Sequence, residues 1–428
     1  MTYEETLHYL YAQLPMFTRI GEKAYKKDLH NTLVLCEALD NPHKKFKSIH
    51  VAGTNGKGST SHMLAAILQQ AGYKTGLYTS PHIRDFGERI RINGEMIEEQ
   101  FVIDFVEQTK ALTQEVEPSF FELTVVMAFE YFASRQVDIA IIETGLGGLL
   151  DSTNVISPEL SVITNIGFDH VNILGNTLPE IAFQKAGIIK KDTPVVIGEY
   201  LPETKPVFEQ KAATEQANIF FAQDMYSIHN IMQGELLRCD VKDQHNGISE
   251  HFILDLTGAY QVNNLRTVLA AEKILMQLGY KISEAQEKYA LSHVKQLTGL
   301  RGRWDVLQQR PAVIQDVAHN TDGITQVLRQ LESNYPEAQL HFVLGFVKDK
   351  DVEHVLELFP KSAQFYFTNA HIPRALPAAD LEAMAFRKNL QGTVYDDVND
   401  AITAAKKNAA DKDVVMICGS FFIIAEIR

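Results

Sequence analysis

Short apolar runs rich in β-branched residues alternate with longer helical patterns from Lys47 onward. This alternation is typical of parallel strands joined by crossover helices. The clearest unit is a strand at Ser48–Ala52, a turn at Gly53–Gly58 and a helix at Ser59–Ala71. Gly72 follows the helix at the place where a left-handed cap is wanted, so we expect the helix to end there.

The pattern forms two series, which we separate near residue 297. The first series is interrupted by a less regular, hairpin-like stretch over residues 200–260, and the second restarts after Thr298. In the first series, the other strands are predicted at Thr75–Thr79, Asp138–Glu143, Leu160–Asn165 and Pro194–Gly198, with helices at Pro179–Lys191 and Asn264–Leu278. In the second, strands are predicted at Ala312–Asp316, Leu340–Gly345, Gln364–Thr368 and Asp413–Cys418, with helices at Gly323–Leu331, Asp351–Phe359, Leu381–Lys388 and Asp400–Ala410.

The length of the chain also predicts more than one domain. Its 428 residues exceed the roughly 250 to 300 that one hydrophobic core usually organises. We expect an α/β fold with a parallel-sheet domain over residues 1–297 and a smaller Rossmann-like domain over residues 298–428. Gly299, Arg301 and Gly302 provide an exposed joint between them.

Composition and charge exclude several classes of protein. Apolar residues make up 45% of the chain and charged residues 22%, as in ordinary globular proteins. The net charge of −14 repels a phosphate backbone, so no nucleic-acid partner is expected. No apolar run is long enough to span a membrane, and Met1–Lys27, predicted to be largely helical, lacks the core of a signal peptide. Three distant cysteines predict neither disulfides nor a cysteine metal site, and the cytoplasm is the expected location.

The turn after the first strand has the features of a phosphate-binding loop. Its glycines let backbone N–H groups face an anion, the start of the helix adds a positive dipole end, and Lys57 supplies an ammonium group. The spacing departs from G-x-x-x-x-G-K-[ST], because Gly58 separates Lys57 from the hydroxyls of Ser59 and Thr60, either of which could bind magnesium. The alternative is a turn that only packs the strand against the helix. We predict contacts with ATP from Gly53, Thr54, Asn55, Gly56, Lys57, Gly58, Ser59 and Thr60.

The heptapeptide at residues 53–59 resembles the loop of the Mur ligase superfamily, and specifically its folate branch of folylpolyglutamate and dihydrofolate synthases. Further segments similar to that branch follow in family order and extend over nearly the whole chain. They are Thr79–His82, Gly87–Ile90, Glu143–Gly148, Asp151–Asn154, Asp169–His170, Lys185–Lys190, Asp316–Asn320 and Gly419–Ser420. The resemblance implies the Mur ligase architecture: a P-loop ATPase domain followed by a glutamate-ligase domain.

The resemblance also implies a reaction. A carboxylate needs activation before an amine can displace its oxygen, and transfer of the γ-phosphoryl group of ATP supplies that activation as an acyl phosphate. The expected reaction is ligation of L-glutamate to a folate and to dihydropteroate. Leu149 stands where the bifunctional bacterial form often has arginine, so the pterin site is less well supported than the ATP site. The resemblance implies two magnesium ions and a monomer, and it leaves open a monovalent cation.

Four matching positions are implied to hold magnesium: Ser80, Glu143, His170 and a carbamylated Lys185. The residues alone leave alternatives open. His170 could be a hydrogen-bonded structural histidine, Glu143 a partner of a helix cap, and Lys185 an ordinary lysine paired with a phosphate or a carboxylate.

Other matching positions are implied to bind substrates or to act in catalysis. Asp316 and His319 would lie beside the γ-phosphate and the incoming glutamate, which Ser420 would help to hold. Asn264 would contact adenine and Arg303 the phosphates, although Asn264 could simply cap its helix and Arg303 could form a salt bridge in the linker. Arg301 replaces the proline that usually precedes Gly302-Arg303 in this branch. The expected catalytic set is Lys57, Lys185, Asp316 and His319, and the expected substrate set is His82, Arg89, Asp151, Thr153, His319 and Ser420.

Other functions remain open at this stage. A small-molecule kinase or a P-loop ATPase would transfer or release phosphate without ligation, and a non-catalytic nucleotide-binding regulator is a further alternative. Peptidoglycan Mur ligases carry an additional amino-terminal domain for the UDP-sugar, and we expect the 52 residues before Gly53 to be too few for it. Two sites on two domains also predict a hinge that brings Arg303 and His319 to the phosphates when ATP binds.

Overall fold

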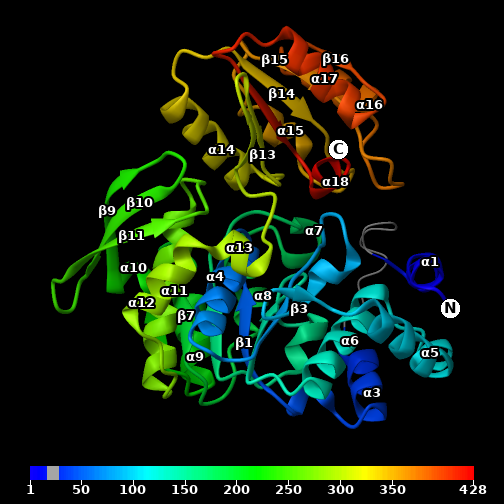
Figure 1. Cartoon of the computed structure of the whole chain (residues 1–428), viewed down its shortest axis with the longest axis vertical. Coiled ribbons are helices and arrows are strands. Elements are labelled where there is room, and N and C mark those ends of the chain that lie inside the picture. Colours follow the sequence, from blue (N-terminus) through cyan, green and yellow to red (C-terminus); the bar gives the residue numbers. More distant parts are fainter. Residues whose placement is uncertain (17–27) are drawn as a thin grey trace.

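The computed structural model describes residues 1–16 and 28–428 and contains two lobes, each built on a sheet of its own (Figure 1). In spatial order, the main sheet of the first lobe contains β4 (Glu95–Met96), β3 (Ile90–Ile92), β2 (Thr75–Tyr78), β5 (Ile139–Glu143), β1 (Lys47–Ala52), β6 (Leu160–Ile163), β7 (Val195–Ile197) and β8 (Ile219–Phe221). Six strands run parallel, namely β2, β5, β1, β6, β7 and β8. The other two, β3 and β4, extend one edge in antiparallel pairing.

Helices cover both faces of this sheet, because parallel strands joined by crossovers must bury both sides. Ile49 and Val51 of β1 share one core with helices α4 (Lys57–Gln70) and α11 (Gln261–Gln277). Ala52 points to the opposite face and packs against α8 (Leu178–Ala186) and α9 (Lys205–Thr214). The other α-helices of this lobe are α1 (Tyr3–Gln13), α3 (His30–Ala38), α5 (Glu99–Val116), α6 (Phe120–Ser134), α7 (Val171–Leu174), α10 (Ala222–Met225), α12 (Glu284–Ser292) and α13 (Val294–Thr298), with 3₁₀ turns η2 (Pro42–Lys44), η3 (Phe86–Arg89) and η4 (Ser152–Val155).

The second lobe has a six-stranded sheet. Its spatial order is β12 (Asp305–Gln309), β13 (Ala312–Gln315), β17 (Val414–Cys418), β14 (Leu340–Leu344), β15 (Gln364–Phe367) and β16 (Gly392–Val394), with only β12 antiparallel to its neighbour. Its helices are α14 (Thr321–Asn334), α15 (Val352–Leu356), α16 (Ala378–Arg387), α17 (Val398–Asn408) and α18 (Phe421–Ala425). The predicted α/β class, with two sheets in series, is therefore confirmed.

Most predicted elements are confirmed, with ends shifted by a few residues. Helix α4 begins at Lys57 rather than Ser59, because Gly56 adopts the left-handed conformation, with φ of 83°, and serves as the N-cap. The predicted helix at Pro179–Lys191 ends early, at Ala186. The helical prediction for Met1–Lys27 holds for Tyr3–Gln13, whereas residues 17–27 lie outside the described part.

The less regular stretch over residues 200–260 contains more structure than predicted. Besides α9, β8 and α10, it forms a three-stranded antiparallel sheet of β9 (Tyr226–Met232), β10 (Leu237–Asp243) and β11 (Ser249–Leu254). One face of this sheet packs against α11 and α12, so its apolar residues join the core that contains β1. Across residues 1–16 and 28–428, we find no helix with the length and apolar character that crossing a bilayer requires.

Candidate active site

A cavity of about 650 Å³ is lined by residues at the carboxyl ends of β1, β5 and β6 and by residues of the second lobe. Ligands commonly bind at this edge of a parallel sheet, because loops and helix amino termini converge there. Both lobes contribute to its walls. Eighteen of the sequence-predicted residues line it: Gly53, Thr54, Asn55, Gly56, Lys57, Gly58, Ser59, Ser80, Arg89, Glu143, Asp151, His170, Lys185, Asn264, Arg303, Asp316, His319 and Ser420.

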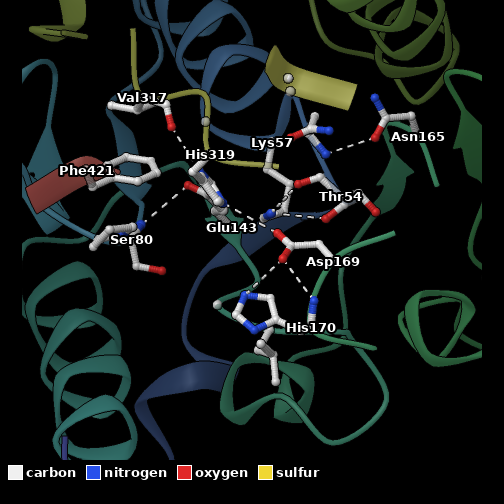
Figure 2. A pocket seen from close by; sticks show the side chains of 18 of the residues that line it. Thr54, Lys57, Ser80, Glu143, Asn165, Asp169, His170, Val317, His319 and Phe421 are labelled. Carbon is white, nitrogen blue, oxygen red and sulfur yellow. Dashed lines mark hydrogen bonds and ion pairs between the residues drawn. The ribbon is translucent and has the colours of Figure 1, made fainter. Parts of the chain in front are cut away.

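The loop between β1 and α4 is held in place by its neighbours. The backbone N–H of Asn55 donates to Asn165 Oδ1 over 2.9 Å, and the Thr164 hydroxyl donates to the carbonyl of Asn55 over 2.6 Å. The Lys57 ammonium turns back and donates to the carbonyls of Gly53 at 3.0 Å and Thr54 at 3.2 Å (Figure 2). Burial lowers the pKa of Lys57, against the attraction of Glu143 and Asp169. The loop therefore presents a desolvated cation, which favours an anionic ligand.

Two glycines of this loop leave no room for a side chain. A Cβ atom at Gly53 would lie 1.9 Å from Thr164 Oγ1, and one at Gly56 would lie 2.2 Å from Asn264 Oδ1. Gly56 also has positive φ, which disfavours other residues. Asn264 is fixed in turn, since its amide donates to Gln261 Oε1 and Gln261 donates to the Ser59 hydroxyl. Helix α11 is thereby tied to the loop.

Glu143 ends β5 inside the cavity with only 4% of its surface exposed. Its Oε2 atom accepts a hydrogen bond of 3.4 Å from the backbone N–H of Ser80. Burial raises the pKa of Glu143 to about 7, although Lys57 and Arg303 oppose the shift. The residue caps none of the helices in the described ranges, so the structure does not show the alternative of a helix-cap partner there. Glu143 is instead a buried carboxyl facing the phosphate loop.

Lys185 projects from α8 to the other side of the same loop. Its ammonium donates to the carbonyl of Gly53 over 2.9 Å, and the residue is 4% exposed. Burial, together with the nearby charge of Lys57, lowers the pKa of Lys185 to about 7. A substantial fraction of this amine is therefore uncharged, and nucleophilic, near neutral pH.

His170 follows Asp169 at the start of α7 with a left-handed backbone. Burial, with a contribution from Lys350, lowers its pKa to about 3, so the imidazole is neutral. Its Nε2 atom lies 3.2 Å from the ammonium of Lys350, a residue of the second lobe. The same ammonium contacts Asp169 Oδ1 at 2.5 Å, and it helps to hold the pKa of Asp169 well below its usual range although burial acts in the opposite direction.

The second lobe contributes Asp316 just after β13. Its Oδ2 atom accepts from the Tyr260 hydroxyl at 2.6 Å and from the Trp304 backbone N–H at 2.8 Å, while Oδ1 accepts from the Ala318 N–H at 2.8 Å. Burial raises the pKa of Asp316 despite these donors. His319 Nδ1 lies 2.8 Å from the carbonyl of Val317, so we assign its hydrogen to Nδ1 (Figure 2).

The structure also decides between the alternatives for Asn264 and Arg303, and it gives the position of Ser420. Asn264 lies inside α11, which begins at Gln261, so it does not cap the helix. Arg303 packs its guanidinium 5.2 Å from the Phe421 ring, and no salt bridge to it is found within residues 1–16 and 28–428. Ser420 is the N-cap of α18 and accepts from the Ile423 N–H at 3.3 Å.

Three predicted residues do not line the cavity. Thr60 is fully buried in α4. Thr153 is also fully buried, and its hydroxyl bonds to Asp151 Oδ1 at 2.5 Å and to His50 Nε2 at 2.8 Å, because Asp151 caps the turn that contains it. His82 Nδ1 accepts from Arg89 Nε at 2.8 Å. Thr60 and Thr153 are buried outside the cavity, and contact of these three residues with a ligand stays a prediction. Thr153 and His82 hold Asp151 and Arg89.

Other cavity residues were not among the predicted site residues. Tyr260 and Lys350 have no role predicted from the sequence, and Asp169 is only part of a matching segment. Tyr260 and Asp169 each bond to the opposite lobe, so their partners are far away in the sequence. Only the folded chain brings such pairs together.

We expect Glu143→Gln to stabilise the ligand-free protein at alkaline pH. A carboxyl whose folded-state pKa is raised contributes stability that is complete below its unfolded pKa and is lost as the pH rises through about 7. Glutamine avoids that loss, so the free energy of unfolding should rise by about 2 to 4 kcal/mol at pH 8 and change little at pH 4. Urea denaturation at both pH values measures the difference. Glu332→Gln on the exposed surface of α14 is the control, and an equal gain at both pH values would contradict the assignment.

Comparison with known proteins places the chain in a family. The Mur ligase middle domain matches residues 51–272, and the Mur ligase glutamate ligase domain matches residues 302–421. The chain is 36% identical to the dihydrofolate synthase/folylpolyglutamate synthase of Bacillus subtilis, over 92% of each chain. It is 32% identical to the folylpolyglutamate synthase of Lacticaseibacillus casei, over 100% of this chain and 98% of that protein.

Solved structures give the same result. E. coli FolC in complex with DHPP and ADP has a TM-score of 0.87 and 28% identity, covering 99% of this chain and 96% of its own. The sequence comparisons and the structural comparisons both cover nearly the full length of the chain. The protein belongs to the Mur ligase family, in the branch of the folylpolyglutamate and dihydrofolate synthases.

Proposed function

We propose that this protein is an ATP-dependent ligase that joins L-glutamate to a folate and also to dihydropteroate. The observation that carries the proposal is one cavity in which the phosphate loop of the first lobe faces Asp316 and His319 of the second. Relatives named for both synthase activities support it. The division into residues 1–297 and 298–428, a monomeric state and a cytoplasmic location stay part of the proposal, and membranes and nucleic acids have no place in it.

The reaction proceeds in two steps. An oxygen of the folate carboxylate attacks the γ-phosphorus of ATP, the bond to the bridging oxygen breaks, and ADP leaves. The amine of glutamate then attacks the carbonyl carbon of the acyl phosphate, loses a proton and displaces inorganic phosphate. Positioning and electrostatic stabilisation supply most of the acceleration in phosphoryl transfer.

The phosphate loop and its neighbours bind ATP in this scheme. Backbone N–H groups at the start of α4 and the Lys57 ammonium hold the phosphates. Arg303 approaches the loop from the linker, where its guanidinium lies 3.2 Å from a Cβ built at Gly58. Asn264 contacts adenine, in keeping with its place on α11 beside Gly56. Thr60 supports the loop from within α4 rather than touching the nucleotide.

Magnesium fits the donor groups around Glu143. No three His, Cys, Asp or Glu side chains in the described ranges could hold a metal by themselves. Magnesium, however, commonly combines one or two carboxylates with phosphate oxygens and water. Glu143, Ser80 and His170 would hold one ion and the carbamate of Lys185 a second, and the ions would neutralise charge on the phosphates. A monovalent cation remains an open requirement.

Lys185 is suited to carbamylation. Its uncharged amine can add to the carbon of CO₂ and lose a proton, so that a cation becomes an anion. The lowered pKa of Lys185 supports this step, because the amine must be uncharged to react. Bicarbonate-dependent activity at low pH, lost in Lys185→Gln, is the observable consequence.

The remaining residues bind the two acids. Arg89, which is 4% exposed and stacks 5.2 Å from the Phe120 ring, offers its guanidinium to a carboxylate of the folate substrate, and Asp151 lines the same wall. His82 and Thr153 position these two residues. His319 and Ser420 hold the incoming glutamate, and Asp316 lies between it and the phosphates.

Tyr260→Phe should lower kcat about tenfold while leaving the Kd for ADP nearly unchanged. The change removes a hydrogen bond of 2.6 Å to the buried carboxylate of Asp316, and a lost bond to a charged group is worth about 1.5 to 3 kcal/mol. Steady-state kinetics and ADP titration measure the two quantities. The control is Tyr280→Phe, which loses a comparable bond to Glu159 away from the cavity. Equal effects of the two variants would contradict a role for Tyr260 in the site.

A coupled assay of ADP release tests the function. Release should require both L-glutamate and a pteroyl acceptor, and it should occur with tetrahydrofolate and with dihydropteroate but not with a UDP-muramoyl acceptor. Release that ignores glutamate would indicate a kinase or an ATPase, and product from the UDP-sugar would indicate a peptidoglycan ligase. If product forms with tetrahydrofolate but not with dihydropteroate, the dihydrofolate synthase activity is removed from the proposal.

A further inference from the structure

Asp169 lies in the first lobe, yet most of its side-chain partners belong to the second. Its Oδ1 atom contacts the Lys350 ammonium at 2.5 Å. Its Oδ2 atom lies 3.4 Å from the Asn320 amide nitrogen and 3.5 Å from His319 Nε2. Figure 2 shows the carboxylate of Asp169 between His170 and His319. One carboxylate of the first lobe thus receives three groups of the other lobe.

The ion pair is well shielded. The side chains of Lys350 and Asp169 are 8% and 12% exposed. Exposed ion pairs contribute little, whereas removing one partner of a buried pair leaves an uncompensated charge at high cost. The loss of either charge would therefore leave the other one buried without its partner.

The segment that carries Lys350 is braced within the second lobe. Asp349 forms a two-point ion pair with Arg374, the Lys348 N–H donates to the carbonyl of Arg374 over 3.1 Å, and Val347 pairs with Ala375. The loop that carries Lys350 is therefore held firmly within the second lobe. A contact that fixes the Lys350 ammonium thus also fixes the position of that lobe.

The Asp169 contacts lie next to the phosphate loop. Asn320, which also caps α14, donates from its amide to Asn55 Oδ1 over 3.0 Å. His319 precedes it directly. The residues of the second lobe that lie against Asp169 thus adjoin the phosphate loop.

We propose that Lys350 is a positioning residue for the ligation: its ion pair with Asp169 holds the second lobe so that His319 and Asn320 face the phosphate loop. This inference rests on the proposed function for its kinetic consequence only. Lys350 acts through Asp169 and the contact between the lobes. Its replacement should therefore leave nucleotide binding by the first lobe unchanged.

The test compares Lys350→Met with two matched variants, Lys348→Met and Lys350→Arg. Lys348 lies on the same loop, but it is exposed and does not line the cavity. For Lys350→Met, we expect kcat to fall about 10²-fold, because small misplacements of reacting groups cost that much, with a Kd for ADP within about threefold of the unmodified protein. Small-angle scattering of the ligand-free variant should give a larger radius of gyration. Lys348→Met should match the unmodified protein in all three measurements, and Lys350→Arg should recover most of kcat.

Three results would overturn the proposal. They are an unchanged kcat, an unchanged radius of gyration, or a loss of ADP affinity as large as the loss of kcat. If Lys350→Met does not fold, Asp169→Asn removes the same pair from the other side and is judged by the same criteria. If the unmodified protein releases no ADP in response to glutamate, the proposed function fails, but the scattering comparison still decides on Lys350.

Discussion

Lys57→Ala is expected to lower kcat/KM for ATP by about 10² to 10³-fold, the range seen when one preorganised donor to a developing charge is removed. The ammonium lies on the phosphate loop, and its hydrogen bonds within residues 1–16 and 28–428 go to the carbonyls of Gly53 and Thr54. Because these acceptors are neutral, the Lys57 ammonium can readily exchange them for a phosphate. Steady-state kinetics with ATP as the varied substrate measures the loss.

The same variant should not be destabilised. Burial lowers the pKa of Lys57, so the folded protein bears a cost for this charge that alanine would remove. Thermal unfolding should therefore occur at the same temperature or higher. Lys74→Ala is the control, because its ammonium also donates to a carbonyl, that of Arg135, but on the surface. Intact turnover in Lys57→Ala would remove the basis for ATP binding at this loop.

Gly56→Ala should weaken ADP binding about 10²-fold or more, because the new methyl group would lie 2.2 Å from Asn264 Oδ1. Asn264 cannot withdraw easily, since Gln261 ties it to Ser59. The loop must shift instead, and misplacement of the backbone donors is costly. Titration with ADP measures the loss, and stability should fall as well.

A comparison with Gly72→Ala separates the steric contact from the backbone strain as causes of the losses expected for Gly56→Ala. Gly72 has φ of 93°, comparable to the 83° of Gly56, but nothing lies within 4 Å of its Cβ position. It should show the backbone strain alone, about 1 to 2 kcal/mol of stability, with unchanged ADP binding. Equal ADP affinities in the two alanine variants would contradict the contact between Gly56 and Asn264.

Local pattern was sufficient to predict most of the fold. The strands β1, β5 and β6 are short, almost wholly buried segments rich in β-branched residues, and each stands before a polar or glycine-rich turn, so their type and order could be predicted from neighbouring residues. The sheet of β9, β10 and β11 was not resolved into strands, because its strands alternate buried and exposed positions only in part and gain their order from packing on α11 and α12.

The candidate site was predictable where its residues form contiguous motifs. Gly53–Ser59 and Glu143 are of this kind, and they line one cavity. Contacts between lobes were not predictable, since Tyr260 with Asp316 and Lys350 with Asp169 are separated by 56 and 181 residues. A matching segment does not tell which of its side chains point into the cavity: the Thr153 hydroxyl lies against His50 and the His82 ring against Arg89.

The contacts that join the lobes beside the phosphate loop also bear on ionic strength. Asn55 and Asn320 pair through neutral amides, and the charges of Lys350 and Asp169 are largely shielded from solvent. Dissolved salt weakens exposed charge pairs far more than buried ones. The lobes should thus keep their arrangement in concentrated electrolyte. Counter-ions in solution would therefore change the rate at which nucleotide is captured more than they change how the two lobes fit together.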